Sequence, residues 1–423
     1  MRPWIVWSTG LFAYTVAVLN RTSFGVSGLD AAERFTASPG VLSWFVVLQV
    51  VVYAAMQIPG GVLLDHFGPK RMIVTGGCLM SVGQLGLGLT VSLPVAIAAY
   101  ALVGLGDAFI FIAVIRLIPN WFAPTRAPLI TQLTALCGQS GQVLSAVPFL
   151  ALLQHAGWTV AYVSVAALGV MSITLTLALV RDTPREHVEA TEPTGLRERL
   201  AAVTTVWARP GTRLGFFTHM GTQSPLTVFA LMWGVPYLTK AQGLSRGAAS
   251  GLLTLSTAVF ILVGVLVGMF SGRHPRYRPP LVLATIAACA LAWAAVLALP
   301  STAPLWLLVA LVVVLSAAQP VSLLAFDFAR DFNPPATLGT AQGTVNMGGF
   351  TASLMVMLAM GWILTAAGGY SFTAFRLAWL PLFAVWALAA TGVVVAGGKV
   401  GAVGFDEHVR RRMEPTAISR TNH

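Results

Sequence analysis

Twelve long apolar runs constrain the fold of this chain more than any other feature of its sequence. They cover residues 4–28, 41–63, 72–92, 95–119, 128–153, 158–180, 213–238, 247–270, 280–299, 304–326, 338–366 and 374–396. One helix needs about 20 apolar residues to cross the hydrocarbon core of a bilayer. A helix also satisfies its own backbone polar groups there. The sequence therefore predicts an all-α integral membrane protein with twelve transmembrane helices.

Charged residues are too few for a soluble domain. Of the 423 residues, 57% are apolar and only 9% are charged, whereas soluble domains carry about 25%. The net charge of +11 does not indicate nucleic-acid binding, because the basic residues lie in short segments between the apolar runs. Cys78, Cys137 and Cys289 lie inside apolar runs, a placement that gives neither a disulfide framework nor a metal-ligand spacing.

The positions of lysine and arginine predict the orientation of the chain. If both termini are cytoplasmic, the outer segments contain only Arg34, Lys240, Arg246 and Arg376, and the remaining basic segments face inward. Positive charge gathers on the cytoplasmic side of membrane proteins. The first apolar run lacks a basic leader and a small-residue cleavage site, so we expect it to stay as a helix. The prediction is a multi-pass protein of the cell inner (plasma) membrane.

Two halves are predicted, on either side of a charged connection. They form an N-terminal six-helix bundle (1–180), a cytoplasmic linker (181–212), a C-terminal six-helix bundle (213–397) and a cytoplasmic tail (398–423). A short amphipathic helix is expected near Leu196–Val206. The halves repeat, because Gly61–Arg71 aligns without a gap with Gly268–Arg278. Two parallel repeats predict a substrate site between them, near the bilayer midplane.

The segment Gly61–Arg71 resembles the signature loop of the major facilitator superfamily, a Gly-x-Leu-x-Asp-Arg-x-Gly-x-Lys/Arg pattern between helices 2 and 3. The matching residues are Gly61, Leu63, Asp65, Gly68, Lys70 and Arg71. His66 replaces the usual arginine. The resemblance covers essentially the whole chain and implies two pseudo-symmetric six-helix bundles. It also implies a secondary transporter, usually monomeric, that moves a small solute by alternating access and is not an enzyme.

Within that superfamily the first half is similar to the anion:cation symporter group. The similarity is carried by Tyr14…Asn20-Arg21-Thr-Ser-Phe, by Gly104-Leu-Gly-Asp107-Ala and by Trp121-Phe…Arg126. Asn20 stands where a proton-coupled aspartate is common, and Asp107 stands for a glutamate. The Gly-Pro-x-x-Gly-Gly element of drug:proton antiporters is missing from the fifth run. The resemblance implies protons and a small organic anion as partners, with the bilayer around them and no cofactor.

Two ionisable residues inside apolar runs are the main candidates for the transport mechanism. Arg21 is expected to bind an anionic substrate group by paired hydrogen bonds. Asp107, near the midplane, is expected to carry the coupling proton. The alternatives are a snorkelling arginine and a purely structural carboxylate. Counting along the helices does not place the two at one depth, so no pairing between them is predicted.

Further candidates are uncharged. His219 and Gln223 lie one helical turn apart in the seventh run and are expected to line the substrate site, although a lone membrane histidine is more often a packing residue. Gln49, Gln132 and Asn346 are the other substrate-binding candidates. Amides of this kind also serve as ordinary hydrogen-bonding contacts between membrane helices.

The signature loop predicts a cytoplasmic gate. Asp65 is expected to meet the positive N-terminal end of a facing helix, with Arg116 as a partner. The loop residues Gly61, Gly68, Lys70 and Arg71 complete this gate. The alternative for Asp65 is a simple determinant of topology. In the second half, Asp327, Arg330 and Asp331 are expected to form a charge network.

Three hypotheses for the function stay open at this point. The leading one is proton-coupled uptake of a small organic anion. The second is efflux of amphipathic drugs or metabolites by proton antiport. The third is a transporter-like sensor or lipid-handling scaffold. No Walker sequence occurs, so ATP is not expected to supply the energy.

Overall fold

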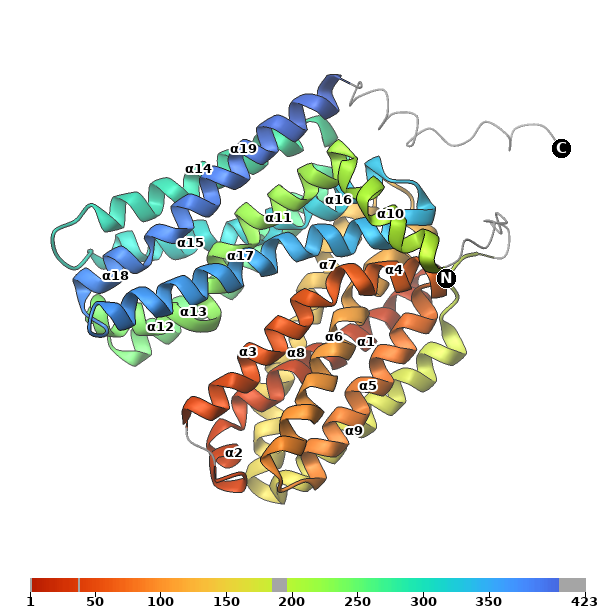
Figure 1. The fold of residues 1–423 in the computed structure, drawn as a ribbon, viewed down its shortest axis with the longest axis horizontal. Coiled ribbons are helices and arrows are strands. Elements are labelled where there is room, and N and C mark those ends of the chain that lie inside the picture. The colour runs from red at the N-terminus through yellow and green to blue at the C-terminus, as the bar shows by residue number, and fades with distance from the viewer. Residues whose placement is uncertain (1, 37–38, 185–195, 403–423) are drawn as a thin grey trace. The chain divides into compact units, whose positions relative to one another are not determined.

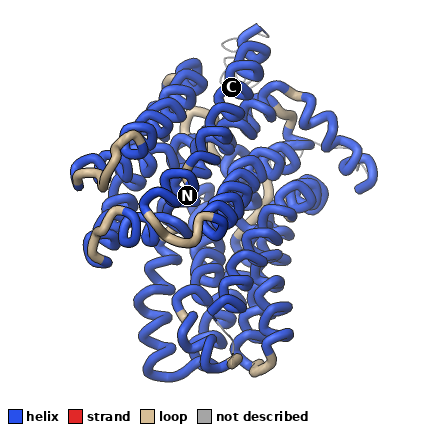
Figure 2. Tube along the Cα trace, turned by 60° about the vertical axis from the view of Figure 1, so that its left-hand side comes forward, coloured by secondary structure: helices blue, strands red, loops and turns tan. Residues whose placement is uncertain are grey.

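The computed structural model describes residues 2–36, 39–184 and 196–402, and within these ranges it is helical with no strand (Figure 2). The α-helices are α1 (Arg2–Val26), α2 (Gly28–Arg34), α3 (Pro39–Ala55), α4 (Gln57–Phe67), α5 (Pro69–Leu89), α6 (Leu93–Trp121), α7 (Ala127–Gly138), α8 (Ser140–Leu144), α9 (Leu150–Leu179), α10 (Leu196–Ala208), α11 (Pro210–Val228), α12 (Gly234–Pro236), α13 (Arg246–Arg273), α14 (Arg278–Leu297), α15 (Leu305–Ser322), α16 (Leu324–Phe332), α17 (Leu338–Ala366), α18 (Phe372–Ala378) and α19 (Leu380–Ala402). Short π-helical turns lie at Ser145–Phe149, Phe229–Trp233 and Tyr237–Ala241, and 3₁₀ turns at Pro275–Tyr277 and Pro335–Thr337.

All twelve predicted spans coincide with helices. Eight helices of the described residues are long and apolar enough to cross a membrane, and a ninth span is formed by α3 and α4, bent by 48° at their junction. One of the eight, Ala127–Leu179, has 53 residues and contains two predicted spans. Gly157 separates them, with a φ of +83° that interrupts the helix. The remaining two predicted spans correspond to α1 and to the helical stretch that begins with α11.

Proline explains where some spans lose regular α-helical geometry. Pro148 lies inside the π-helical turn before α9, and Pro225 lies near the end of α11, just before another such turn. A proline inside a helix removes one backbone donor and clashes with the preceding turn. The π-helical turns keep each of these spans helical past its proline.

The described residues pack into two units. The first contains Met1–Ala123, Leu133–Thr204 and Pro335–Gly343, and the second contains Pro124–Gln132, Thr205–Pro334 and Thr344–His423. Each unit therefore includes a short segment from the other half of the sequence. These segments are the start of α17 in the first unit and the start of α7 in the second.

Small residues bring helices together inside the first unit. α5 packs along both α6 and α9 (Figure 1). A Cβ atom on Gly76 of α5 would lie 2.7 Å from the carbonyl oxygen of Gly106 on α6. Glycine at such a crossing allows two membrane helices to approach closely. This approach fixes the position of α6, which carries Asp107.

The predicted linker helix is present as α10. Residues 185–195 of the linker and 403–423 of the tail lie outside the described residues, so the predicted boundaries of those two segments stay predictions.

Candidate functional site

Arg21 of α1 and Asp107 of α6 form an ion pair inside the first unit. Nη1 of Arg21 lies 3.2 Å from Oδ2 of Asp107. The Asp107 side chain is fully buried, whereas 23% of the Arg21 side chain is exposed. The sequence did not predict this pairing, because counting residues along a helix ignores the reach of a long arginine side chain. The guanidinium group lies at the depth of the middle of α6.

Tyr100 connects this pair to Gln49. Its hydroxyl contacts the backbone carbonyl oxygen of Arg21 at 2.9 Å and Oε1 of Gln49 at 3.2 Å. Sequence reasoning missed Tyr100, although it precedes Asp107 by two helical turns and so shares its face of α6. Gln49, predicted as a substrate-binding residue, therefore belongs to the same polar group as Arg21.

Several buried acceptors near this group have no hydrogen-bond partner among the described residues. They are Oδ1 of Asp107, Oδ1 of Asn20 and Oε1 of Gln84. Gln84 itself donates from Nε2 to the backbone oxygen of Asn20 at 3.0 Å. A buried polar atom without a partner is uncommon and indicates a functional or hydrated position. Oδ1 of Asp107 is therefore an atom at which a proton can be held.

His219 and Gln223 both contact α17 in the second unit. Nδ1 of His219 accepts a hydrogen bond from the backbone N–H of Gly349 at 3.2 Å, so a neutral imidazole carries its proton on Nε2. Oε1 of Gln223 accepts one from Ser353 at 3.4 Å. A Cβ atom on Gly349 would overlap the His219 ring. These contacts favour the alternative in which the two residues hold α11 against α17.

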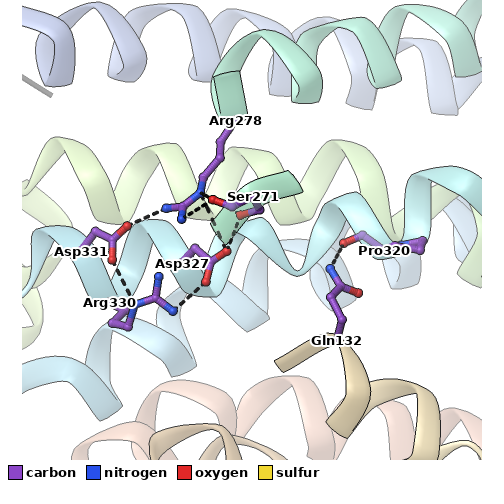
Figure 3. A network of polar contacts seen from close by, with 7 residues as sticks. All are labelled: Gln132, Ser271, Arg278, Pro320, Asp327, Arg330 and Asp331. Atoms are coloured by element: carbon purple, nitrogen blue, oxygen red, sulfur yellow. Dashed lines mark hydrogen bonds and ion pairs between the residues drawn. The ribbon is translucent and has the colours of Figure 1, made fainter. Parts of the chain in front are cut away.

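The other two predicted amides also lie in the second unit. Nε2 of Gln132 donates to the backbone oxygen of Pro320 at 2.7 Å, a contact between the start of α7 and α15 (Figure 3). Asn346 is buried on α17. The contact of Gln132 is of the interhelical kind that membrane helices commonly use.

Asp65 binds the first turn of α17, as the signature loop predicts. Oδ1 accepts from the backbone N–H of Gly339 at 2.6 Å, and Oδ2 accepts from the N–H and the hydroxyl of Thr340, both at 2.7 Å. The first N–H groups of a helix have no partner within it, and the helix dipole favours an anion there. Gly61 lies one turn earlier, where any Cβ atom would collide with the backbone of Gly339.

Arg116 holds the same segment through a different contact. It donates to the backbone oxygen of Pro335 at 2.9 Å and to Oδ1 of Asn120 at 2.8 Å. No hydrogen bond joins Arg116 to Asp65 among the described residues, but the positive charge of Arg116 acts on that carboxylate, as the sequence predicts. Arg116 and Asp65 therefore bind neighbouring parts of one segment.

The remaining loop residues surround Asp182, which sequence reasoning had counted only as a linker charge. Oδ1 of Asp182 accepts from the backbone N–H of Lys70 at 2.6 Å, at the start of α5. Gly68 precedes that helix with a φ of +80°, a conformation that favours glycine. The ammonium group of Lys70 donates to the backbone oxygen of Leu177 at 2.6 Å, and Arg71 is exposed. Burial raises the pKa of Asp182, and the nearby cations oppose this shift.

The predicted charge network of the second half is present, with a fourth member. Nη1 of Arg278 lies 2.6 Å from Oδ2 of Asp331. Arg330 binds Asp327 at 2.7 Å and Asp331 at 3.0 Å. Ser271 accepts from Nε of Arg278 and donates to Oδ2 of Asp327 (Figure 3). We call the two arginines and two aspartates the charge quartet. In the sequence repeat Arg278 aligns with Arg71, yet Arg278 is buried whereas Arg71 is exposed.

Known proteins with similar sequences include probable transporters of small organic acids. The chain is 23% identical to the probable sulfoacetate transporter SauU of Cupriavidus necator, over 84% of this chain and 86% of that protein. It is 21% identical to the probable galactarate/D-glucarate transporter GudP of Escherichia coli K12, over 88% of each chain.

The fold has a solved counterpart. The structure of the proton:xylose symporter XylE bound to 6-bromo-6-deoxy-D-glucose matches with a TM-score of 0.70 at 14% identity, over 92% of this chain and 94% of that one. A family model described as Major Facilitator Superfamily matches residues 10–357. The motifs of the signature loop, the helical plan and this match agree: the chain is a multi-span membrane protein that belongs to the Major Facilitator Superfamily.

Proposed function

We propose that this transporter takes up a small organic anion together with a proton, by alternating access, across an inner membrane with both chain termini on the cytoplasmic side. The observation that carries the proposal is the ion pair between Arg21 and Asp107 in the interior of the first unit. Ionisable residues at membrane depth are costly and therefore mark substrate and proton pathways.

The charges of this pair give a coupling rule. With Asp107 ionised, the pair is neutral and Arg21 is occupied. At 3.2 Å and an effective dielectric constant of about 20, the Coulomb attraction is about 5 kcal/mol. A substrate anion has to compete with that attraction unless Asp107 is protonated. One proton on Asp107 and one anionic group on Arg21 restore neutrality, so proton and anion are expected to bind together.

The chemistry of the site favours a carboxylate or sulfonate. A guanidinium group presents two parallel N–H donors to such groups. Gln49 and the Tyr100 hydroxyl lie within the same hydrogen-bonded group, where they can supply further polar contacts. The similarity to transporters of sulfoacetate and of galactarate/D-glucarate supports the same substrate class.

The contacts of Asp65 with α17 are proposed to act as the cytoplasmic gate. Three hydrogen bonds to one carboxylate hold the start of that helix. Arg116 binds the backbone oxygen of Pro335, in the segment just before the helix. Making these bonds closes the gate, and breaking them opens it. Such an element has two discrete states, as a switching transition requires.

A thermal-shift screen of the purified protein tests the substrate class. Sulfoacetate, D-glucarate and other organic acids are compared with sugars and with amphipathic drugs, because a ligand that binds the folded state raises its stability. An organic acid is expected to stabilise the protein, and Arg21→Ala is expected to remove that effect. Arg246→Ala, at an exposed position, is the matched control.

Transport is then measured in liposomes with the stabilising acid. An inward proton gradient is expected to drive accumulation, and a protonophore is expected to abolish it. Accumulation that survives both the protonophore and Arg21→Ala contradicts the proposal. Stabilisation by drugs alone, with unchanged behaviour of Arg21→Ala, favours the efflux hypothesis instead.

A further inference from the structure

A groove in the second unit lies outside all the residues discussed so far. It runs between α11 and α19, which pack side by side (Figure 1), and it encloses about 320 Å³. We propose that this α11–α19 groove binds an anionic phospholipid. The phosphate would lie against Arg213 and Lys399, and an acyl chain would follow the apolar wall formed by Phe217, Leu388 and Val395.

The apolar wall opens toward lipid. Leu388 and Val395 are 55% and 54% exposed, and both lie in a helix apolar enough to cross the membrane. Exposed apolar residues on such a helix face acyl chains, because the interior of a bilayer offers no water. At the base of the groove, a Cβ atom on Gly392 would overlap the Phe217 ring, so α19 has room for that ring only because residue 392 is glycine.

The charged end of the groove is suited to a phosphate. Arg213 is the fourth residue of α11 and Lys399 is the fourth from the end of α19, and no carboxylate is among the lining residues. Arg213 is held in place, because Nε and Nη2 donate to the backbone oxygens of Trp207 and Ala208 at 2.9 and 2.7 Å. Lys399 is exposed, and no hydrogen bond joins it to another described residue. Two cations without an acid leave a net charge of +2 at the end of an apolar channel.

The position along the helices is that of a lipid head group. Trp207, which lines the groove and is 39% exposed, is of the residue type enriched at membrane–water interfaces. The bias of lysine and arginine assigns this end of the helices to the cytoplasmic leaflet, where anionic lipids attract basic residues. Basic pockets between membrane helices bind phospholipid head groups for this reason. A free phosphate would use the cations but leave the apolar wall without a partner.

Native mass spectrometry of the detergent-purified protein tests the proposal. The protein is titrated with phosphatidylglycerol and, separately, with phosphatidylcholine of the same acyl chains. We expect preferential retention of phosphatidylglycerol. Lys399→Gln is expected to weaken its binding about fivefold, since one basic residue near a membrane surface contributes about that factor. Lys240→Gln, an exposed lysine at the other end of the unit's first span, is the matched control and is expected to change nothing.

A second variant separates the groove from diffuse surface charge. Thr391→Trp would fill the groove while keeping both cations, and it is expected to reduce phosphatidylglycerol binding as well. Equal binding of the two lipids contradicts the proposal, and so does unchanged binding of phosphatidylglycerol in Lys399→Gln. Displacement of the lipid by millimolar inorganic phosphate would also overturn it, because a site for small anions needs no acyl chain. If Thr391→Trp does not fold, the exposed Lys399 variant still decides the question.

Discussion

Replacing Asp107 with asparagine separates the two charges of the ion pair while keeping the shape of the side chain. Under the proposed coupling, an anion binds Arg21 of the unaltered protein only after Asp107 takes up a proton. Above the pKa of that carboxyl group, each further unit of pH therefore weakens the free energy of anion binding by 1.36 kcal/mol, which raises the dissociation constant tenfold. Affinity falls as pH rises, because protonated Asp107 becomes rarer.

The variant is expected to lose this dependence. Asparagine needs no proton, so the dissociation constant should stay constant over about two pH units and should equal the best value of the unaltered protein. The Coulomb attraction of about 5 kcal/mol that holds Arg21 on Asp107 is also gone. Binding of the acid that stabilises the protein best is measured by calorimetry across the pH range.

Transport gives a second result for the same variant. In liposomes, Asp107→Asn is expected to exchange labelled for unlabelled substrate but not to accumulate it in response to a proton gradient. Asp107→Glu keeps a carboxyl group and should retain the tenfold change per pH unit, even if its absolute affinity differs. A tenfold change per pH unit that persists in Asp107→Asn would refute the assignment of the coupling proton to this residue.

Two further predictions concern stability. Asp65→Ala removes the acceptor for the backbone amides of Gly339 and Thr340. Since a hydrogen bond to a charged group is worth about 1.5–3 kcal/mol, hydrogen exchange at these amides should accelerate roughly tenfold to a hundredfold. Unchanged protection would contradict the gate contact. Arg278→Ala leaves buried carboxylates with one arginine and should lower the free energy of unfolding by about 3–5 kcal/mol, measured by thermal or denaturant unfolding. Arg276→Ala, two residues away in the sequence and exposed, should change it by less than about 0.5 kcal/mol.

The spans were predictable because lipid imposes a simple requirement. Every predicted run has to satisfy its backbone groups and hide its polar side chains from hydrocarbon, and each became a helix. The interruption at Gly157 falls between two predicted runs, where the sequence leaves room for a turn. The bend between α3 and α4 falls inside one run and had no signal in the pattern of apolar residues.

Side-chain contacts were predictable where a motif carried them or where the partners are close in sequence, as Arg330 is to Asp327 and Asp331. The signature loop indicated that Asp65 meets a helix N-terminus, and it does so at α17. The same reasoning chose Arg116 as a partner. Its charge does act on Asp65, while its hydrogen bonds go to Asn120 and to the backbone oxygen of Pro335. Pairing of Arg21 with Asp107, and the contact of Asp182 with the start of α5, depend on helix packing in three dimensions. Positions along the chain do not contain that information.

The charge quartet restricts how this protein can change through descent. Its two arginines and two aspartates balance one another within hydrogen-bond distance, and Arg278 is almost inaccessible to solvent. Replacing one of the four by a neutral residue leaves an uncompensated charge in the protein interior. Losing one arginine together with one aspartate does not. Related sequences should therefore keep or lose these residues in oppositely charged couples. A lineage lacking Arg278 should also lack Asp331.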